Sequence, residues 1–450
     1  MVVLLSGCEG LFDDLDVDAN QSDPPNTEPN TQPNAPDPDE CEQCADDEQC
    51  VDGQCIPDDK DPCPDEQELC DDQCVDTTSD NRHCSGCFTP CGSDEFCDNG
   101  GCQPIAFTTD TIDDADTSDA IDIHPLALGI DTEHQLHAVY ASRTVQSQDG
   151  QLRLSSANAE NPSWGDPTIL EESLNHPRHA VLIEDHKLHL ALSKDNNLHH
   201  AHMDLDDGEL STLTSVRAGE VYDPSIAIDA QGQPAITVSR DSKVFYLSLD
   251  DGSWTLEDVS DIDASTAADI DITFDAHDRP HIVYIDNLDI QGASTYSLHR
   301  AYIDDGSWEK EEIADDLTIS QRFGMTIDEE HLHLVFRQRA QGQLKYARLA
   351  IDDGHWHREP ISNEEAASAR GAISVAVDDA GGVQALYLDT STPPRLRYVR
   401  RISEDQWTDV LVDEFNDGFR HQLIVDANGH PHIIYSPEDG DQLRYATYDQ

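Results

Sequence analysis

Residues 274–284 read FDAHDRPHIVY, and residues 425–435 read VDANGHPHIIY. The same unit recurs from Ile121 to the end of the 450-residue chain. Each copy carries an acid that ends a short apolar run, and successive acids lie 45 to 53 residues apart. The seven anchor acids are Asp131, Glu184, Asp229, Asp275, Asp328, Asp378 and Asp426. A period of about 20–50 residues indicates a solenoid, propeller or array.

Each copy contains four short runs, with clusters of Asp, Gly, Asn and Pro between them. Alternation of apolar and polar residues within the runs predicts strands, and the clusters predict turns. The fourth run starts at a Trp in five copies: Trp164, Trp254, Trp308, Trp356 and Trp407. Four strands repeated seven times predict an all-β fold, a seven-bladed β-propeller over residues 105–450. The seventh copy ends after its third run, so we expect residues 105–112 to complete that blade and close the ring.

The repeat resembles bacterial propeller repeats with a Pro-His-Ile-x-Tyr signature, here at Pro280 and Pro431. Residues 250–254 and 304–308 both read DDGSW and are similar to the Asp-box of sialidase-type propellers, with one residue fewer between Gly and Trp. The resemblance implies a fold of this superfamily. Because the Asp-box is a structural turn, it does not imply sialidase activity.

The beginning of the chain resembles a bacterial lipobox. Residues 5–8 read LSGC, which makes Cys8 the predicted acylated residue. The preceding segment, residues 1–5, has no Lys or Arg and is shorter than an ordinary signal peptide, so we expect the natural start to lie upstream. No run of 18 apolar residues follows Cys8, so membrane attachment is expected through lipid alone.

Residues 9–40 are rich in Asp, Asn and Pro. Such a composition cannot bury a core, and it predicts a disordered tether. At roughly 3.1 Å per residue, the tether could hold its cargo up to about 100 Å from a membrane.

Residues 41–104 hold twelve of the thirteen cysteines. They are Cys41, Cys44, Cys50, Cys55, Cys63, Cys70, Cys74, Cys84, Cys87, Cys91, Cys97 and Cys102. An even number of cysteines in a short exported segment predicts a disulfide module. Disulfides would replace the core that this segment lacks. The pairing stays open, and a zinc site at Cys41 and Cys44 or at Cys84 and Cys87 is the alternative.

The spacing around Cys63, Cys74 and residues 84–91 resembles a cysteine-rich repeat of surface proteins from myxobacteria and their relatives. Versions of that repeat commonly read Asn-Cys-Gly-x-Cys-Gly, whereas residues 83–88 read HCSGCF. The resemblance implies an exported, surface-associated protein.

The chain has 93 acidic and 26 basic residues, for a formal net charge of −67. Phosphates would be repelled, so nucleic acid is not expected as a partner. Two explanations of the acidity stay open, namely adaptation to salty water and binding of calcium. No run matches an EF-hand loop, and we expect no other cofactor and no metal site.

Ten of the 24 basic residues of the propeller map to loops on one face, the usual binding face of a propeller. They are Arg143, Arg178, Lys194, Arg217, Arg240, Arg322, Arg337, Arg339, Arg370 and Arg420. A ring of Arg would attract an anionic ligand such as an acidic glycan. The alternative is that these side chains pair with neighbouring acids such as Glu184, Asp223 and Asp269.

Histidine recurs at one repeat position, as His137, His189, His281, His333 and His432. A repeated histidine is expected to hydrogen-bond a turn or a neighbouring blade. His200 and His202 share a strand face and could share a metal, but the sequence reveals no third ligand. The recurring Tyr140, Tyr284, Tyr387 and Tyr435 follow the apolar alternation and are expected in the core.

Catalysis would need a nucleophile, a base and a group that stabilises charge. Tyr222 and Asp223 are the candidates that accompany the Arg set. We expect an outer-membrane lipoprotein, exposed to the periplasm or the cell surface, that acts as a monomeric binding module for an acidic glycan or a surface partner. A glycoside hydrolase of sialidase type or a polysaccharide lyase is the alternative. A structural role in the envelope is a third class.

Overall fold

The computed structural model of the chain forms two compact units, Met1–Cys74 and Val75–Gln450. It describes residues 48–51, 54–57, 63, 67–70, 73–75, 77–78, 83–89, 91–92, 95–98, 100–114, 121–144, 150–174, 179–184, 186–206, 208–219, 221–241, 243–259, 268–290, 293–317, 323–338, 343–361, 372–378, 381–389, 391, 393–403, 406–414, 420–427, 429–437 and 442–448. The predicted lipidation site Cys8 and the predicted tether lie outside these residues.

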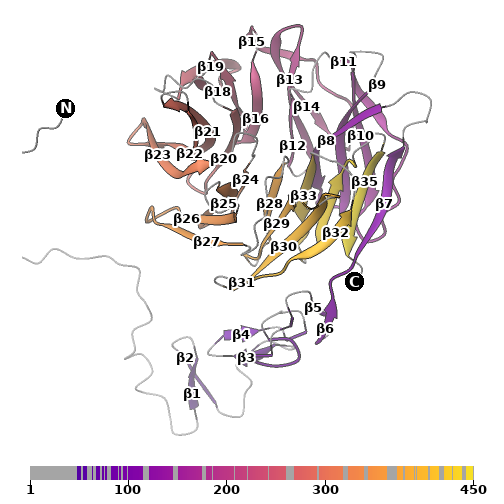
Figure 1. Cartoon of the computed structure of the whole chain (residues 1–450), viewed down its shortest axis with the longest axis vertical. Helices are drawn as coiled ribbons and strands as arrows, with labels where there is room; N and C mark the ends of the chain where they lie inside the picture. The colour runs from indigo at the N-terminus through magenta and orange to yellow at the C-terminus, as the bar shows by residue number, and fades with distance from the viewer. Residues whose placement is uncertain are drawn as a thin grey trace, which may run out of the picture. The chain divides into compact units, whose positions relative to one another are not determined.

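Seven blades of antiparallel strands confirm the predicted all-β, seven-bladed propeller, and the pair Leu317 and Gln338 joins blades 4 and 5 in one sheet (Figure 1). Blade 1 contains β8 (Ile121–Ile130), β9 (Gln135–Thr144), β10 (Gly150–Asn158) and β11 (Thr168–Leu174). Blade 2 contains β12 (His179–Glu184), β13 (Lys187–Lys194), β14 (Asn197–Asp204) and β15 (Thr214–Ala218). Blade 3 contains β16 (Tyr222–Ile228), β17 (Pro234–Arg240), β18 (Lys243–Asp250) and β19 (Ser253–Asp258).

Blade 4 contains β20 (Ala268–Phe274), β21 (Pro280–Ile290), β22 (Ala293–Asp304) and β23 (Ser307–Leu317). Blade 5 contains β24 (Gly324–Ile327), β25 (His331–Gln338), β26 (Gln343–Ala350) and β27 (Trp356–Pro360). Blade 6 contains β28 (Ile373–Val377), β29 (Val383–Leu388), β30 (Arg395–Ser403), β31 (Gln406–Trp407) and β32 (Val410–Glu414). Blade 7 contains β33 (His421–Val425), β34 (Pro431–Tyr435) and β35 (Gln442–Tyr448), and β7 (Phe107–Asp114) is its outer strand.

The pairing of β7 with β35 confirms that an N-terminal strand closes the ring. The strand begins two residues later than expected, because Ile105 is 7% exposed and packs in the core between blades 6 and 7. Phe96 stacks on Tyr448 in the same core, with 5.0 Å between ring centroids. The last part of the cysteine-rich segment therefore packs against the seam at which the ring closes.

The hydrophobic core is divided among the seven junctions between blades. One buried cluster fills the junction of each consecutive pair, and the cluster with Tyr140 and Tyr445 joins blade 7 to blade 1. The recurring tyrosines are at most 3% exposed, as expected for core residues. Trp164, Trp308 and Trp407 each place a ring edge against a tyrosine of the preceding blade, at 5.3–5.4 Å between centroids.

The two DDGSW segments form tight hairpin turns. Asp251 and Gly252 have φ of 44° and 76°, and Asp305 and Gly306 have φ of 46° and 77°. Two central residues at positive φ define a two-residue type I′ turn, which Asp-Gly favours. These segments are therefore short β-hairpin loops, and the missing residue before Trp distinguishes them from the Asp-box.

The cysteine-rich segment contains three two-stranded sheets. They are β1 (Glu48–Val51) with β2 (Gln54–Pro57), β3 (Glu68–Cys70) with β4 (Gln73–Val75), and β5 (Glu95–Asp98) with β6 (Gly101–Pro104). Disulfides join Cys84 to Cys97 and Cys91 to Cys102. Cys63, Cys70 and Cys87 are also disulfide-bonded. The zinc alternative for Cys84 and Cys87 is therefore wrong, because a disulfide sulfur has no thiolate to donate. Cys41 and Cys44 lie outside the described residues.

The anchor aspartates hold the turn between the first two strands of their blades. In blade 4, the Oδ1 of Asp275 accepts hydrogen bonds from the backbone N–H groups of His277 and Arg279, both at 2.9 Å. Its Oδ2 accepts one from the Nε2 of His281 at 3.0 Å. Burial alone would raise the pKa of Asp275, but the hydrogen bonds from His281 and Arg279 outweigh it and lower the pKa. The recurring histidine is thus structural here, as expected.

Replacing Asp275 by Asn should lower the free energy of unfolding by about 3 kcal/mol. The Asn would keep an oxygen for the two backbone groups but would turn an N–H donor toward the N–H of His281. Asp229→Asn is the matched control, because Asp229 accepts the same two backbone hydrogen bonds and has Ala235, which offers no side-chain donor, at the histidine position. Urea denaturation measures both. Equal losses in the two variants would contradict a stabilising role for the Asp–His bond.

Candidate functional site

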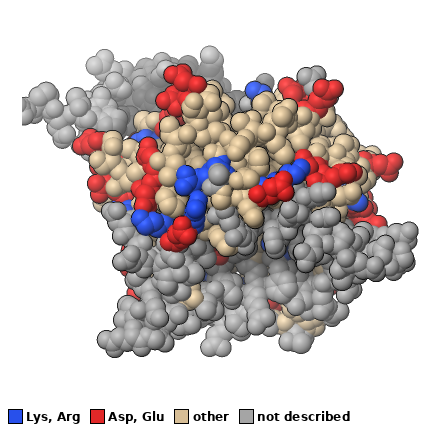
Figure 2. Space-filling model, turned by 90° about the horizontal axis from the view of Figure 1, so that it is seen from above, with Lys and Arg blue, Asp and Glu red and all other residues tan. Residues whose placement is uncertain are grey.

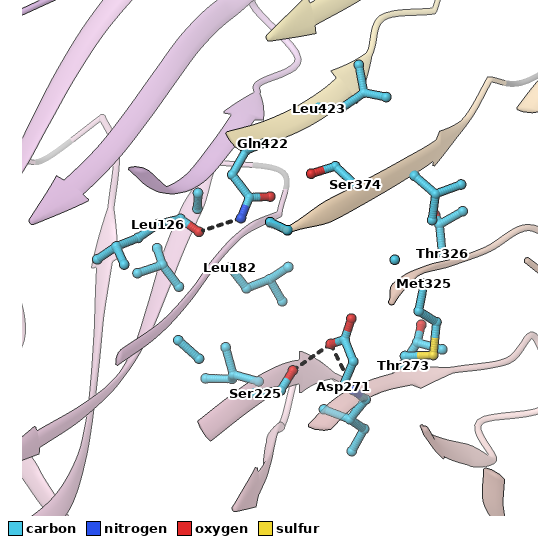
Figure 3. A pocket seen from close by; sticks show the side chains of 18 of the residues that line it. Leu126, Leu182, Ser225, Asp271, Thr273, Met325, Thr326, Ser374, Gln422 and Leu423 are labelled. Carbon is cyan, nitrogen blue, oxygen red and sulfur yellow. Dashed lines mark hydrogen bonds between the residues drawn. The ribbon is translucent and has the colours of Figure 1, made fainter. Parts of the chain in front are cut away.

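A cavity of about 590 Å³ lies among the innermost strands of the ring (Figure 3). The innermost strands of all seven blades line it: β8, β12, β16, β20, β24, β28 and β33. Each inner strand points alternate side chains toward the cavity and toward the blade junctions. The side chains that face the cavity can therefore be polar, whereas those that face a blade junction are mostly apolar.

Asp271 is an acid within the inner strand β20 that lines the cavity. Its Oδ1 accepts hydrogen bonds from the Ser225 hydroxyl at 2.7 Å and from the Ile272 backbone N–H at 3.0 Å (Figure 3). Burial raises the pKa of Asp271 to about 6, and the two hydrogen bonds oppose this shift only in part. Near neutral pH, the carboxyl can therefore act either as an acceptor or, when protonated, as a donor.

A second polar group comes from blades 6 and 7. Gln422 donates from Nε2 to the Leu126 carbonyl at 3.2 Å, a bond that spans the closure of the ring from blade 7 to blade 1. Beside it, His421 donates from Nε2 to the Ala372 carbonyl at 2.8 Å, and its Nδ1 lies 3.0 Å from the Ser374 hydroxyl. Burial lowers the pKa of His421 to about 4, so its imidazole is neutral at pH 7.

Charged residues line the cavity where inner strands begin. Asp223 and Asp269 occupy equivalent positions at the starts of β16 and β20, with φ of 45° and 49°. Asp tolerates this left-handed backbone better than most residues do. Arg420, which directly precedes β33, also lines the cavity. Because the inner strands of a propeller run in the same direction, these three residues mark one mouth of the channel.

The structure separates the predicted arginines by environment. Arg420 lines the cavity, whereas Arg240 and Arg337 do not. The Nε of Arg240 lies 3.3 Å from Asp241, and Lys194 pairs with Glu171 at 2.7 Å. The space-filling view likewise shows basic side chains beside acidic ones (Figure 2). Pairing with a neighbouring acid, the alternative given above, therefore describes Arg240 and Lys194.

Arg337 is buried between blades 5 and 6. It is 3% exposed, and its guanidinium donates to the Leu388 carbonyl at 3.2 Å. Arg143 lies on β9, and Arg178, Arg322 and Arg370 lie outside the described residues, so their side chains remain predictions. Of the two catalytic candidates, Asp223 lines the cavity, and Tyr222 is 39% exposed and does not.

Sequence reasoning missed Asp271, Ser225, Ser374 and Gln422. A signal was present: Asp271 interrupts the apolar run of its strand between Ile270 and Ile272. A polar residue at an inner-strand position cannot face a blade junction without a partner, so it faces the channel.

Potential metal ligands cluster at three places in the described part of the chain. Two groups, Cys70 with His83 and Cys87, and Cys84 with Cys91 and Cys102, consist mainly of disulfide-bonded cysteines. The third contains Asp328, His331 and His333 and belongs to the anchor turn of blade 5, where His333 donates to Asp328 at 2.9 Å. The described residues contain no helix that is long and apolar enough to cross a membrane.

No protein-family model matches the sequence, and no curated protein matches it. Solved structures match the fold at low identity. An ulvan lyase, described as a new family of polysaccharide lyase, is 12% identical with a TM-score of 0.49, over 74% of this chain and 94% of that one. The polysaccharide lyase Uly1 is 10% identical with a TM-score of 0.47, over 72% and 90%. A Hadza microbial sialidase is 13% identical with a TM-score of 0.42, over 78% and 71%.

The buried imidazole of His421 predicts a specific loss of stability in acid. Its pKa is about 4 in the fold and about 6.5 in an unfolded chain, so the unfolded state takes up a proton first as the pH falls. The free energy of unfolding should therefore decrease between pH 6.5 and pH 4, by up to about 3 kcal/mol from this group. Below pH 4 the contribution levels off.

A comparison of His421→Gln with the exposed His355→Gln tests this, using urea denaturation at pH 7 and pH 4.5. The difference in stability between the parent and His421→Gln should shrink at the lower pH, and His355→Gln should follow the parent. An unchanged difference at the two pH values would show that His421 is not held neutral by the fold.

Proposed function

We propose that the protein is an envelope-anchored lipoprotein whose propeller binds a carbohydrate, without catalysis, in the central channel. The observation that carries this proposal is the cavity of about 590 Å³ into which Asp271 and the polar groups of blades 6 and 7 converge. Cavities of this size take ligands comparable to roughly one to three sugar units.

The chemistry of the channel suits hydroxyl groups. Sugar hydroxyls donate and accept hydrogen bonds at fixed spacing. Asp271 is held in place by Ser225 through one oxygen, and its other oxygen faces the cavity (Figure 3). Gln422 is similarly oriented by its bond to Leu126. Side chains that are already positioned bind at a lower entropic cost.

The charged mouth makes an acidic glycan the specific ligand class that we predict. Arg420 stands there with Asp223 and Asp269, and Arg178, Arg322 and Arg370 precede other inner strands in the sequence. Guanidinium groups bind carboxylate or sulfate in a planar fork. Binding through these charges should weaken as salt increases, whereas binding of a neutral glycan through Asp271 and Gln422 should not.

Attachment through Cys8 and the tether would place this binding unit at the outer membrane, facing the periplasm or the cell surface, as a monomer. Two other roles remain distinct proposals: recognition of a surface protein, and binding of calcium by the acidic loops. Nucleic acid is not proposed as a partner.

One observation favours an enzymatic alternative, a glycoside hydrolase or polysaccharide lyase. Burial raises the pKa of Asp271 to about 6, close enough to neutral pH for the carboxyl to exchange a proton as a general acid or base. Tyr222 and Asp223 are further candidates, predicted from sequence. Product formation distinguishes this alternative from binding alone.

The full chain should be titrated calorimetrically with acidic and neutral oligosaccharides and incubated with the corresponding polysaccharides. Asp271→Asn should weaken binding by roughly tenfold or more, because one charged hydrogen-bond acceptor is lost. Glu309→Gln is the matched control, since it removes one charge from the exposed outer strand β23. New reducing ends or unsaturated uronates would establish the enzymatic alternative. Absence of binding to every glycan, or equal binding by both variants, would refute the channel site.

A further inference from the structure

Three histidines lie side by side on one face of blade 2. His200 and His202 are two residues apart on β14, and His189 on β13 pairs directly with His202 across the strands. The three pairs of ring centroids are 5.8, 6.1 and 6.2 Å apart. His189 and His200 are each 7% exposed, and His202 is exposed. The sequence shows His200 and His202 as a pair, and the fold brings His189 to them.

This cluster replaces a structural bond that other blades make. His137, His281 and His333 each donate to an anchor Asp through Nε2, at 2.9–3.0 Å. The Nδ1 of each then meets a partner on the third strand: Ser156, Arg300 and Tyr346, respectively. Both ring nitrogens of the repeated histidine are therefore used in these blades.

Blade 2 departs from this pattern at both ends of its histidine. Its anchor is Glu184, which is exposed and pairs with Lys187 in a shorter turn. The place that Arg300 and Tyr346 take on the third strand is occupied by His200, as the pairing of His200 with Ala191 shows. Consequently, the Nδ1 of His189 and the Nε2 of His200 are buried with no hydrogen-bond partner among the described residues.

Buried polar atoms without partners are rare, and each requires an explanation such as a bound ion. We propose that His189, His200 and His202 form a binding site for a divalent transition metal of the zinc class. Three imidazoles with a fourth position left open are an established ligand set for zinc. The exposed side of His202 would leave that position to water or to a ligand.

The surroundings are consistent with such a site. Burial, together with the neighbouring imidazoles, lowers the pKa of His189 and of His200 to about 4, so both rings are neutral and able to bind metal at pH 7. Trp254 from blade 3 packs against His200 in a T-shaped arrangement, with 5.7 Å between ring centroids. A formal net charge of −67 also concentrates cations near the protein.

The three rings are nearly parallel, with interplanar angles of 22° to 32°. In this arrangement, the three rings do not bring one nitrogen each to within 4.8 Å of the other two. Metal binding therefore requires the rings to rotate about their side-chain bonds, and His202, at the surface, has the most freedom to do so. The proposed site is separate from the central channel, and none of its residues lines that cavity.

The full chain, treated with a chelator and dialysed, should be titrated with Zn²⁺ by calorimetry and with Co²⁺ by visible absorption. We expect one site whose Co²⁺ spectrum shows the intense bands of a four-coordinate ion with three imidazole ligands. His202→Ala should weaken binding by roughly 100-fold or more, because removal of a direct ligand costs at least as much as the loss of a supporting group. His202 is exposed, so this variant should keep the fold.

His189→Gln provides a second test at a buried ligand and should also abolish the Co²⁺ bands. Two controls are matched to the main competing sites: His355→Ala removes an exposed histidine, and His331→Ala disrupts the group at Asp328. Both should bind like the parent. Parent-like binding by His202→Ala and His189→Gln, loss of binding in His331→Ala instead, or no binding by the parent would each overturn the proposal.

Discussion

The bond between an anchor aspartate and a histidine six residues later, or five in blade 5, is the constraint on which blades 1, 4 and 5 depend. In blade 4 the Asp275 side chain is fully buried and His281 is 1% exposed. A buried carboxylate is tolerated only when hydrogen bonds compensate for its lost hydration. Two backbone N–H groups and the imidazole supply them, and Arg300 completes the chain by donating to the other ring nitrogen. One side chain thereby fixes the first turn, the second strand and the third strand of a blade relative to one another.

The Asp–His bond acts within a blade, whereas apolar packing holds neighbouring blades together. Each blade buries its faces against two neighbours, and the ring therefore has no free end except where the chain itself begins and ends. β7 closes that gap by pairing with β35, and Phe96 and Ile105 fill the adjoining core. Since rigid blades surround it, the central channel holds side chains such as Asp271 and Gln422 in fixed directions. The ring thus fixes the positions from which these two side chains can form hydrogen bonds to a ligand.

The fold could be predicted because its strand and turn patterns are local in sequence and occur in seven copies. The absence of a fourth run in the seventh copy also predicted the closing N-terminal strand. The channel could not, because its contacts join distant parts of the sequence: Gln422 bonds to Leu126, and Ser225 bonds to Asp271. The predicted arginine ring shows the same limit. Placing Arg337 in a loop-face position ignored strand alternation, which turns this side chain between blades and toward the Leu388 carbonyl. The position of a residue in the repeat predicts the face of the propeller on which it lies, but it does not predict where its side chain points.

A repeat protein also provides its own comparison. The same backbone environment occurs in several blades, so a residue that departs from the pattern can be judged against its equivalents in one molecule. In blade 6, Gln384 replaces the histidine and still uses both ends, since it donates to the Gly429 carbonyl and accepts from Tyr398. Blade 3 has Ala235 there, whose side chain has no polar atom that needs a partner. Blade 2 alone among the described blades keeps the histidine, loses its aspartate and adds two more imidazoles beside it. Structural requirements account for the residues of blades 3 and 6, and the proposed metal site accounts for the three imidazoles of blade 2.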